Sequence, residues 1–347
     1  MSGTARTIFF FLVMVTAFQP GRSAPSHARG TPASANAALS GDRAKTARAG
    51  PGGAQGSNQT TTLRIGGGEI EVTLPDEQMK VSSEELLAWV RAAATAVSEY
   101  YGHFPVEQLT LRVRAAYGSG VRHGMTYPRG GGLIVISVGK DTPVSDLKDD
   151  WTLTHEMTHL AFPNMPDSHH WIEEGIATYV EPVARVQVGQ MSVNELWREF
   201  IRDMPKGEPE PGDEGLDNTH TWGRTYWGGA LFCLMADVQI HERTRNKKGL
   251  QDALRAIVEH GGRITQDWEI RDALAVGDRA TGTRVLQDLY NQMRDKPSPV
   301  DLSGLWNKLG LQVKDGAVVV NDRAPEAAIR QAITSPRLSL TARRGPH

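Results

Sequence analysis

Apolar positions alternate with polar ones early in the chain and then recur at helical spacing. Residues 63–65 and 70–74 alternate on either side of three glycines, a pattern that predicts a β-hairpin. Ser82 and the acids after it indicate the start of a helix, in which apolar residues recur every three or four positions as far as Tyr100. The first folded part of the chain is thus expected to combine a hairpin with one long helix.

Two more strands are expected before residue 150. Residues 109–113 alternate, and residues 133–138 are almost continuously apolar. Beyond residue 150 most segments have helical periodicity, and a hairpin over 311–321 precedes a last helix over 324–333. This order predicts an α+β protein in which a small mixed sheet is followed by helices.

The first 28 residues are typical of a secretory signal peptide. One basic side chain precedes an apolar run over 8–18, which is too short to span about 30 Å of hydrocarbon, and small residues follow it. An uncleaved membrane anchor is the alternative interpretation.

Residues 29–61 are mainly Ala, Gly, Ser, Pro and Thr without periodicity, which predicts a disordered linker. We therefore expect a secreted or periplasmic protein with no stable membrane insertion after signal cleavage.

The composition excludes several classes of protein. Lys and Arg number 38 against 40 for Asp and Glu, a balance that argues against nucleic-acid binding. Apolar residues make up 39% of the chain, which is enough for a core. Cys233 is the only cysteine, so neither an intrachain disulfide nor a thiolate metal cluster can form, and its apolar neighbours indicate a packing role.

Residues 151–162 are expected to form a helix that ends at Pro163 and carries a metal-binding pattern. His155 and His159 are four residues apart, so both imidazoles project from one face, where they can share one ion. Glu156 lies about 100° further round the helix and can reach a water on that ion without ligating it. The alternative is an amphipathic helix with two surface histidines.

A catalytic zinc site needs a third protein ligand and one open position. After a proline-rich turn a second helix is expected to run back past the first, and Glu174 on it would complete the triad. Thr178 and Glu181 share the face of Glu174, where either can hold the outer nitrogen of a ligating histidine. His169 and His170 are alternative third ligands.

The two histidines followed by residues 171–177, Trp-Ile-Glu-Glu-Gly-Ile-Ala, resemble the gluzincin zinc metallopeptidases, whose third ligand is the Glu before this Gly. The pattern is most similar to the bacterial peptidase MA-like proteins, because 14 residues separate the second His from that Glu and because residues 101–105 resemble a run in those proteins. The aminopeptidase N-like and glycyl aminopeptidase-like families are more distantly similar. The resemblance covers roughly residues 80–290 and implies one bound Zn²⁺.

The fold implied by the resemblance is a two-lobed, thermolysin-like catalytic domain. We expect a sheet lobe over 62–150 and a metal-binding helical lobe over 151–295. A C-terminal extension over 296–347 would contain the short hairpin and the last helix.

The resemblance also implies further site residues. Tyr226 corresponds to a Tyr that faces the metal in gluzincins, where its phenol can donate to the oxyanion formed when water attacks a carbonyl; a core tyrosine is the alternative. Gly131, Gly132 and Leu133, with residues 124–127, resemble the segment that pairs with substrate as an extra strand, although an ordinary glycine-rich hairpin has the same pattern. The Glu that binds a free amino terminus in aminopeptidases has no counterpart here, so the sequence does not predict exopeptidase action.

Residues 204–223 form a segment rich in Pro and acids. It could be a lid that prefers basic substrates, or simply a solvated loop. His220, near its end, is a candidate for assisting the oxyanion.

These features together predict an exported zinc-dependent peptidase that acts on peptide or protein substrates. A metal-activated water would attack the peptide bond with Glu156 as the general base. Two alternatives are a catalytically silent binding module stabilised by the metal, and a hydrolase of a non-peptide amide. The intact set of His155, Glu156, His159 and Glu174 favours an enzyme.

Overall fold

The computed structural model describes residues 60–336 of the chain. The predicted signal peptide over 1–28 lies outside the described residues. So does the predicted linker over 29–61, apart from Thr60 and Thr61, which already belong to the first strand rather than to a linker.

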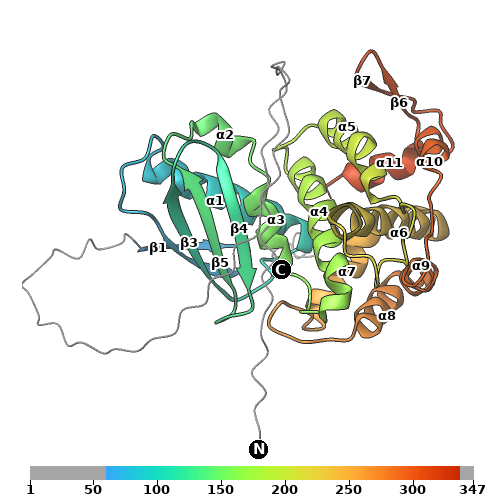
Figure 1. Cartoon of the computed structure of the whole chain (residues 1–347), viewed down its shortest axis with the longest axis horizontal. Helices are drawn as coiled ribbons and strands as arrows, with labels where there is room; N and C mark the ends of the chain where they lie inside the picture. Colours follow the sequence, from blue (N-terminus) through green and yellow to red (C-terminus); the bar gives the residue numbers. More distant parts are fainter. Residues whose placement is uncertain (1–59, 337–347) are drawn as a thin grey trace, which may run out of the picture. The chain divides into compact units, whose positions relative to one another are not determined.

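A five-stranded mixed sheet forms the first part of the fold (Figure 1). Its order is β1-β2-β3-β5-β4, with antiparallel pairs β1–β2 and β4–β5 and parallel pairs β2–β3 and β3–β5. The strands are β1 (Thr60–Ile65), β2 (Gly68–Thr73), β3 (Gln108–Ala116), β4 (Val121–Tyr127) and β5 (Leu133–Gly139). The predicted hairpin and the two predicted strands are confirmed. Strand β4 comes before β5 in the chain but lies outside it in the sheet, where it provides an open edge.

Helix α1 (Ser83–Tyr101) connects β2 to the parallel strand β3. Its capping box is complete: the Ser82 side chain accepts from the amide of Glu85, whose carboxylate accepts from the Ser82 amide at 2.7 Å. Gly102 ends the helix in the left-handed region at φ 85°, which favours glycine. The apolar face of α1 is buried against β1, α3 and α4, so the helix joins the sheet to the part that follows it.

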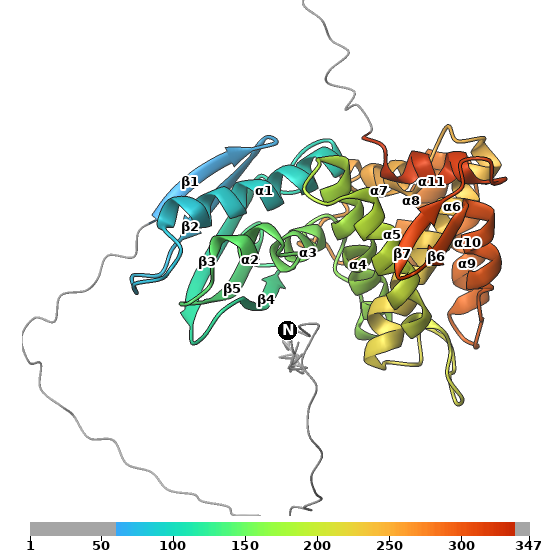
Figure 2. The ribbon, with the colours of Figure 1, turned by 90° about the horizontal axis from the view of Figure 1, so that it is seen from above.

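Two helices follow the sheet after the short α2 (Val144–Lys148): α3 (Thr152–His159) and α4 (His170–Gln187). The predicted helix over 151–162 is shorter than expected, because residues 160–162 continue in tighter turns before Pro163. A single 3₁₀ turn, η1 (Asp167–His169), leads into α4. In both views α3 lies between β4 and α4, and it contacts each of them (Figure 2).

The rest of the described chain is mainly helical. It comprises α5 (Val193–Asp203), the 3₁₀ segment η2 (Met204–Gly207), the π-helical turn η3 (Gly223–Gly228), α6 (Gly229–Thr244), α7 (Leu250–Glu259), α8 (Ile270–Thr281), α9 (Val285–Met293), α10 (Leu302–Leu309), the hairpin β6 (Leu311–Lys314) and β7 (Ala317–Val320), and α11 (Ala327–Thr334). The late hairpin is confirmed, and the last helix begins at Ala327 rather than at residue 324. In residues 60–336, none of the helices has the length and apolar character needed to cross a membrane.

Helices α4 and α6 approach closely because glycine faces glycine. A Cβ on Gly175 would lie 2.3 Å from the backbone of Gly229, and a Cβ on Gly229 would lie 2.2 Å from the carbonyl oxygen of Trp171. Such contacts leave no room for a side chain at either glycine. The contact is made by Gly175, the residue after Glu174, so it fixes the position of α4 at the point where that helix carries Glu174.

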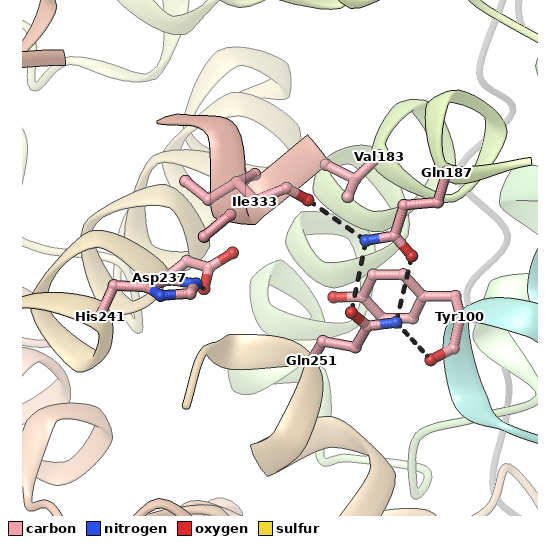
Figure 3. A pocket seen from close by; sticks show the side chains of 8 residues that line it. Tyr100, Val183, Gln187, Asp237, His241, Gln251 and Ile333 are labelled. Carbon is pink, nitrogen blue, oxygen red and sulfur yellow. Dashed lines mark hydrogen bonds and ion pairs between the residues drawn. The ribbon is translucent and has the colours of Figure 1, made fainter. Parts of the chain in front are cut away.

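A small polar cavity lies where α4, α6 and α7 meet α1 and α11 (Figure 3). The amide of Gln187 donates to the carbonyl oxygen of Ile333 at 3.2 Å, and Gln251 donates to the carbonyl oxygen of Tyr100 at 2.8 Å. Gln187 and Gln251 also contact one another. These bonds connect the C-terminal helix to α4 and complete a fold of the predicted α+β class.

Candidate metal centre

Three of the predicted side chains converge between α3 and α4. Nε2 of His155 lies 3.1 Å from Oε2 of Glu174, and Nε2 of His159 lies 3.6 Å from the same oxygen. One ligand atom from each residue lies within 4.8 Å of the others. The convergence follows from local geometry, because a four-residue step places both imidazoles on one face of α3, and α4 passes beside that face.

Burial and neighbouring charge set the protonation of this group. Burial raises the pKa of Glu174, but the contacts with His159, His155 and His170 outweigh it and hold that pKa well below its usual range. Burial lowers the pKa of His159 to about 4, so its imidazole is neutral at physiological pH. Burial also lowers the pKa of His155, but its hydrogen bond to Glu174 and the negative charges of the nearby carboxylates together raise it by more.

The donor set fits a zinc ion. Two neutral imidazole nitrogens and one ionised carboxylate oxygen can direct their lone pairs to a common point, and this His₂Glu set is one that catalytic zinc uses. In the structure Nε2 of His155 is hydrogen-bonded to Glu174, so a bound zinc ion would take the place of the proton between them. That the three residues bind zinc remains a prediction.

Glu156 follows the first histidine of the group and faces strand β4. Thr126 donates its hydroxyl to Oε2 of Glu156 at 2.6 Å and lies 2.9 Å from the Glu156 carbonyl oxygen. A Cβ on Gly124 would lie 2.5 Å from Cγ of Glu156, so a side chain at that point of the strand would displace the Glu156 carboxylate. Burial raises the pKa of Glu156 to about 7. A carboxyl group with this pKa can both accept and return a proton near neutral pH.

Tyr226 reaches the group from the π-helical turn η3. Its ring stacks on that of His155, with the centroids 6.3 Å apart. Burial and the negative charges of Glu174 and Glu156 raise the pKa of the phenol, which therefore keeps its proton and can act as a donor. Single π-helical turns often occur at functional sites, and this one places Tyr226 beside His155. That its phenol donates to an oxyanion stays a prediction.

Asp150 is a supporting residue that the sequence reasoning missed. Its two carboxylate oxygens accept from the amides of Thr152 and Leu153, each at 3.1 Å, and thereby cap the start of α3. Trp89 of α1 donates to the same carboxylate at 3.1 Å. The signal was an Asp just before the first helical residues of the metal-binding pattern, the ordinary position of a capping side chain.

Thr178 and Glu181 were expected to bond to the outer nitrogen of a ligating histidine, but the structure places neither side chain there. Glu181 accepts from Arg185 at 2.9 Å, and Arg185 also donates to the carbonyl oxygen of Asp149. Burial raises the pKa of Glu181 to about 8. Within residues 60–336, the buried hydroxyl of Thr178 has no hydrogen-bond partner, and neither side chain bonds to a histidine of the group. Glu181 instead connects α4 to the loop before α3 through Arg185.

The alternative third ligands do not belong to the group. His170 borders it, with Nε2 at 3.2 Å from Oε1 of Glu174 and Nδ1 at 3.3 Å from Glu173. His169 points to other partners, Tyr290 at 3.2 Å and Asp217 at 3.5 Å. Of these four histidines, only His155 and His159 of α3 both approach the same carboxylate oxygen, Oε2 of Glu174.

The predicted strand for substrate pairing requires a correction. Leu133 begins β5, which is paired with β3 on one side and β4 on the other, so it offers no free backbone edge. A Cβ on Gly131 would lie 2.6 Å from the Gln108 carbonyl oxygen, and one on Gly132 would lie 2.8 Å from Leu160. Both glycines therefore serve internal packing. The open edge belongs to β4, which contains residues 124–127 of the same prediction and whose Thr126 hydroxyl donates to Glu156.

The acidic segment over 204–223 is tied to the protein rather than solvated throughout. Asp213 forms a buried ion pair with Arg224 at 2.7 Å. Asp217 accepts from Trp171 at 2.9 Å and from Tyr290 at 2.8 Å. These pairings leave few free charges for recognising a basic substrate. His220 is exposed, and in the part of the chain that is described it makes no hydrogen bond or ion pair with the group.

No protein-family model matches the chain, and no curated protein matches it. Solved structures do. The aminopeptidase N family protein from Idiomarina loihiensis matches with a TM-score of 0.57 and 12% sequence identity, over 78% of this chain and 53% of that one. The M1 zinc metallopeptidase from Deinococcus radiodurans matches with a TM-score of 0.45 and 14% identity, over 70% of this chain and 52% of that one. The chain thus spans about half the length of these structures. The first match shows that the described part has the fold of an aminopeptidase N family protein.

Proposed function

We propose that the chain is an exported zinc-dependent peptidase. The observation that supports this best is the convergence of His155, His159 and Glu174 within 4.8 Å, with Glu156 beside them and fixed by Thr126. The fold shared with an aminopeptidase N family protein agrees with it. Export rests on the sequence of the first 28 residues alone.

We place the site between a sheet lobe over 62–150 and a helical lobe over 151–295, with α3 at their junction. His155, His159 and Glu174 would hold one Zn²⁺. When bound, zinc lowers the pKa of a water ligand to about 7 and polarises a carbonyl group.

The residues of the chain supply proton transfer and orientation. The Glu156 carboxylate takes the proton from the attacking water and passes it to the nitrogen of the leaving amine. The Thr126 hydroxyl holds Oε2 of Glu156, which leaves the other oxygen to face the water. The Tyr226 phenol donates to the carbonyl oxygen as it gains negative charge.

The substrate is proposed to lie along the open edge of β4. An extended peptide can pair there through main-chain hydrogen bonds, which bind many sequences. Thr126 occupies the strand beside the general base, and its hydroxyl carries no charge to bind a free amino terminus. Cleavage within a chain therefore agrees better with this edge than removal of the first residue.

A peptide library tests the proposal. Zinc-loaded full-length protein is expected to cleave a mixed library, and o-phenanthroline is expected to stop cleavage until Zn²⁺ is restored. The His260→Ala variant, which changes an exposed histidine at the end of α7, is the control and should behave like the wild type. Zinc binding without any cleavage would contradict the proposal and favour a metal-stabilised binding module. Cleavage that persists in the chelator would contradict the role of the metal.

A further inference from the structure

Two tryptophans differ from the other six in the chain. Trp151 is 42% exposed and Trp222 is 51% exposed, whereas the remaining six are buried or partly buried. Single exposed apolar side chains are common on protein surfaces, so exposure alone assigns these rings no role. Their position relative to the candidate metal centre distinguishes them.

Each of the two rings contacts a different aromatic ring of the candidate metal centre. Trp151 precedes α3 and meets the His155 ring edge-to-face at 5.5 Å. The His155 ring stacks on Tyr226, and the Tyr226 ring stacks on Trp222 with the centroids 5.9 Å apart. An unbroken series of four rings thus runs from Trp151 to Trp222, with the ligand and the predicted oxyanion donor at its centre.

Each indole has a neighbour that contacts its ring. The Trp151 ring packs edge-to-face on the buried His155 ring. Trp222 has the ammonium group of Lys206 over its ring at 5.6 Å, and Lys206 is itself fixed by Asp203 at 2.7 Å. A ring that is already ordered loses little entropy when a ligand packs on it.

We propose that Trp151 and Trp222 form two apolar subsites that bind bulky apolar side chains, aromatic ones above all, on either side of the bond that is cleaved. The inference rests on the proposed peptidase function and names its substrate class: polypeptide segments with large apolar residues. The expected ligand is a side chain of the substrate, because each exposed indole contacts a ring of the candidate metal centre, where the cleaved peptide bond must lie. Apolar pockets lined by a few aromatic rings are how proteins usually select such side chains.

Tyr117 provides a matched contrast. Within residues 60–336 it is the most exposed large apolar residue, at 92%, and Lys140 lies 6.0 Å over its ring. In the described residues it contacts none of the four rings of the series. An exposed aromatic ring without this continuity is expected to have no effect on substrate choice.

The test compares pairs of quenched fluorescent peptides that differ only in Phe against Ser beside the cleaved bond. Wild-type zinc protein is expected to prefer the Phe peptides. Trp151→Ala and Trp222→Ala should each lower kcat/KM for the Phe peptides by about 10- to 100-fold more than for the Ser peptides, so that the preference for Phe falls whatever the change in overall rate. Trp151→Phe and Trp222→Phe should retain most of the preference, and Tyr117→Ala should retain all of it. Zinc content should not change in any variant.

A second measurement does not depend on turnover. Binding of the Phe peptides to the Glu156→Gln variant should alter tryptophan fluorescence, and adding Trp222→Ala to that variant should weaken binding. Cleavage without preference for Phe, or full preference in both alanine variants, would overturn the inference and leave the proposed function standing. If the zinc-loaded wild type cleaved nothing, the proposed function would fail, and peptide binding to Glu156→Gln would decide the inference alone.

Discussion

Helices α3 and α4 bury their functional side chains, whereas strand β4 leaves its outer edge open. His155, Glu156 and Glu174 are 5–8% exposed and contact one another or their neighbours. Every residue of β4 is at least partly exposed, and β5 is the strand that pairs with it in the sheet. The first region is therefore suited to hold charges in a fixed arrangement, and the second to bind and release an extended chain.

Glu156 is the functional side chain that connects the two regions. It projects from α3, but Thr126 and Gly124 of β4 determine where its carboxylate lies. Metal binding and chemistry should therefore separate under mutation. Substitutions within α3 and α4 should weaken metal binding, and substitutions on β4 should lower turnover without releasing the metal.

Glu156→Gln should produce the largest separation of the two properties. Gln retains the shape of the side chain but cannot accept a proton, so kcat should fall by about 10²- to 10⁴-fold. Zinc content, measured by mass spectrometry of the acid-digested protein, should remain that of the wild type. Joint loss of zinc and activity would mean that Glu156 belongs to the ligand set.

Tyr226→Phe should have the next largest effect. The change removes only the phenolic hydroxyl, so kcat is expected to fall by roughly 10²- to 10³-fold, as for loss of one donor to an oxyanion. KM should change little, because the donor acts as charge develops on the carbonyl oxygen. Steady-state kinetics on one quenched peptide measure both constants, and an unchanged kcat would assign Tyr226 to packing alone.

Thr126→Val should test the contact between the two regions. Valine retains the branched shape but loses the hydroxyl that bonds to Glu156, and a hydrogen bond to a charged group is worth about 1.5–3 kcal/mol. We expect kcat to fall by about 10- to 100-fold with zinc retained. Thr126→Ser retains the hydroxyl and should restore most of the activity. Equal loss in both variants would point to packing of β4 instead.

Gly175→Ala should disturb the scaffold of the helix pair. The new methyl group would meet the backbone of Gly229, so α4 and α6 must separate slightly. Overpacking of this kind costs about 1–3 kcal/mol in the free energy of unfolding. Urea unfolding measures the change, and Asn194→Ala on the exposed side of α5 is the control. Stability equal to that of the wild type would show that the two helices have room between them.

The helix pair could be predicted well from the sequence because its geometry is local. The step from His155 to His159 is one helical turn, and the turn before α4 is set by nearby prolines. The start of α1 near Ser82 could be predicted for the same reason, from a serine followed by acids. Asp150 also lay within reach of this reasoning, as an acid directly before a helix.

The sheet edge could not be predicted in the same way. Gly131, Gly132 and Leu133 precede or begin an apolar strand, but strand order depends on pairings between residues distant in the chain. That order puts β5 inside the sheet and β4 at its edge. Contacts such as Thr126 with Glu156, 30 residues apart, and the partner of Glu181 require the packed fold and leave no periodic signal in the sequence.

The most direct test of the account is the zinc content of the Glu174→Ala variant of the full-length protein. After zinc loading and dialysis, the wild type and His260→Ala should each retain one ion per chain, while Glu174→Ala should retain far less because its third ligand is missing. A Glu174→Ala protein that is folded and holds as much zinc as the wild type would contradict the claim that α3 and α4 together bind the metal.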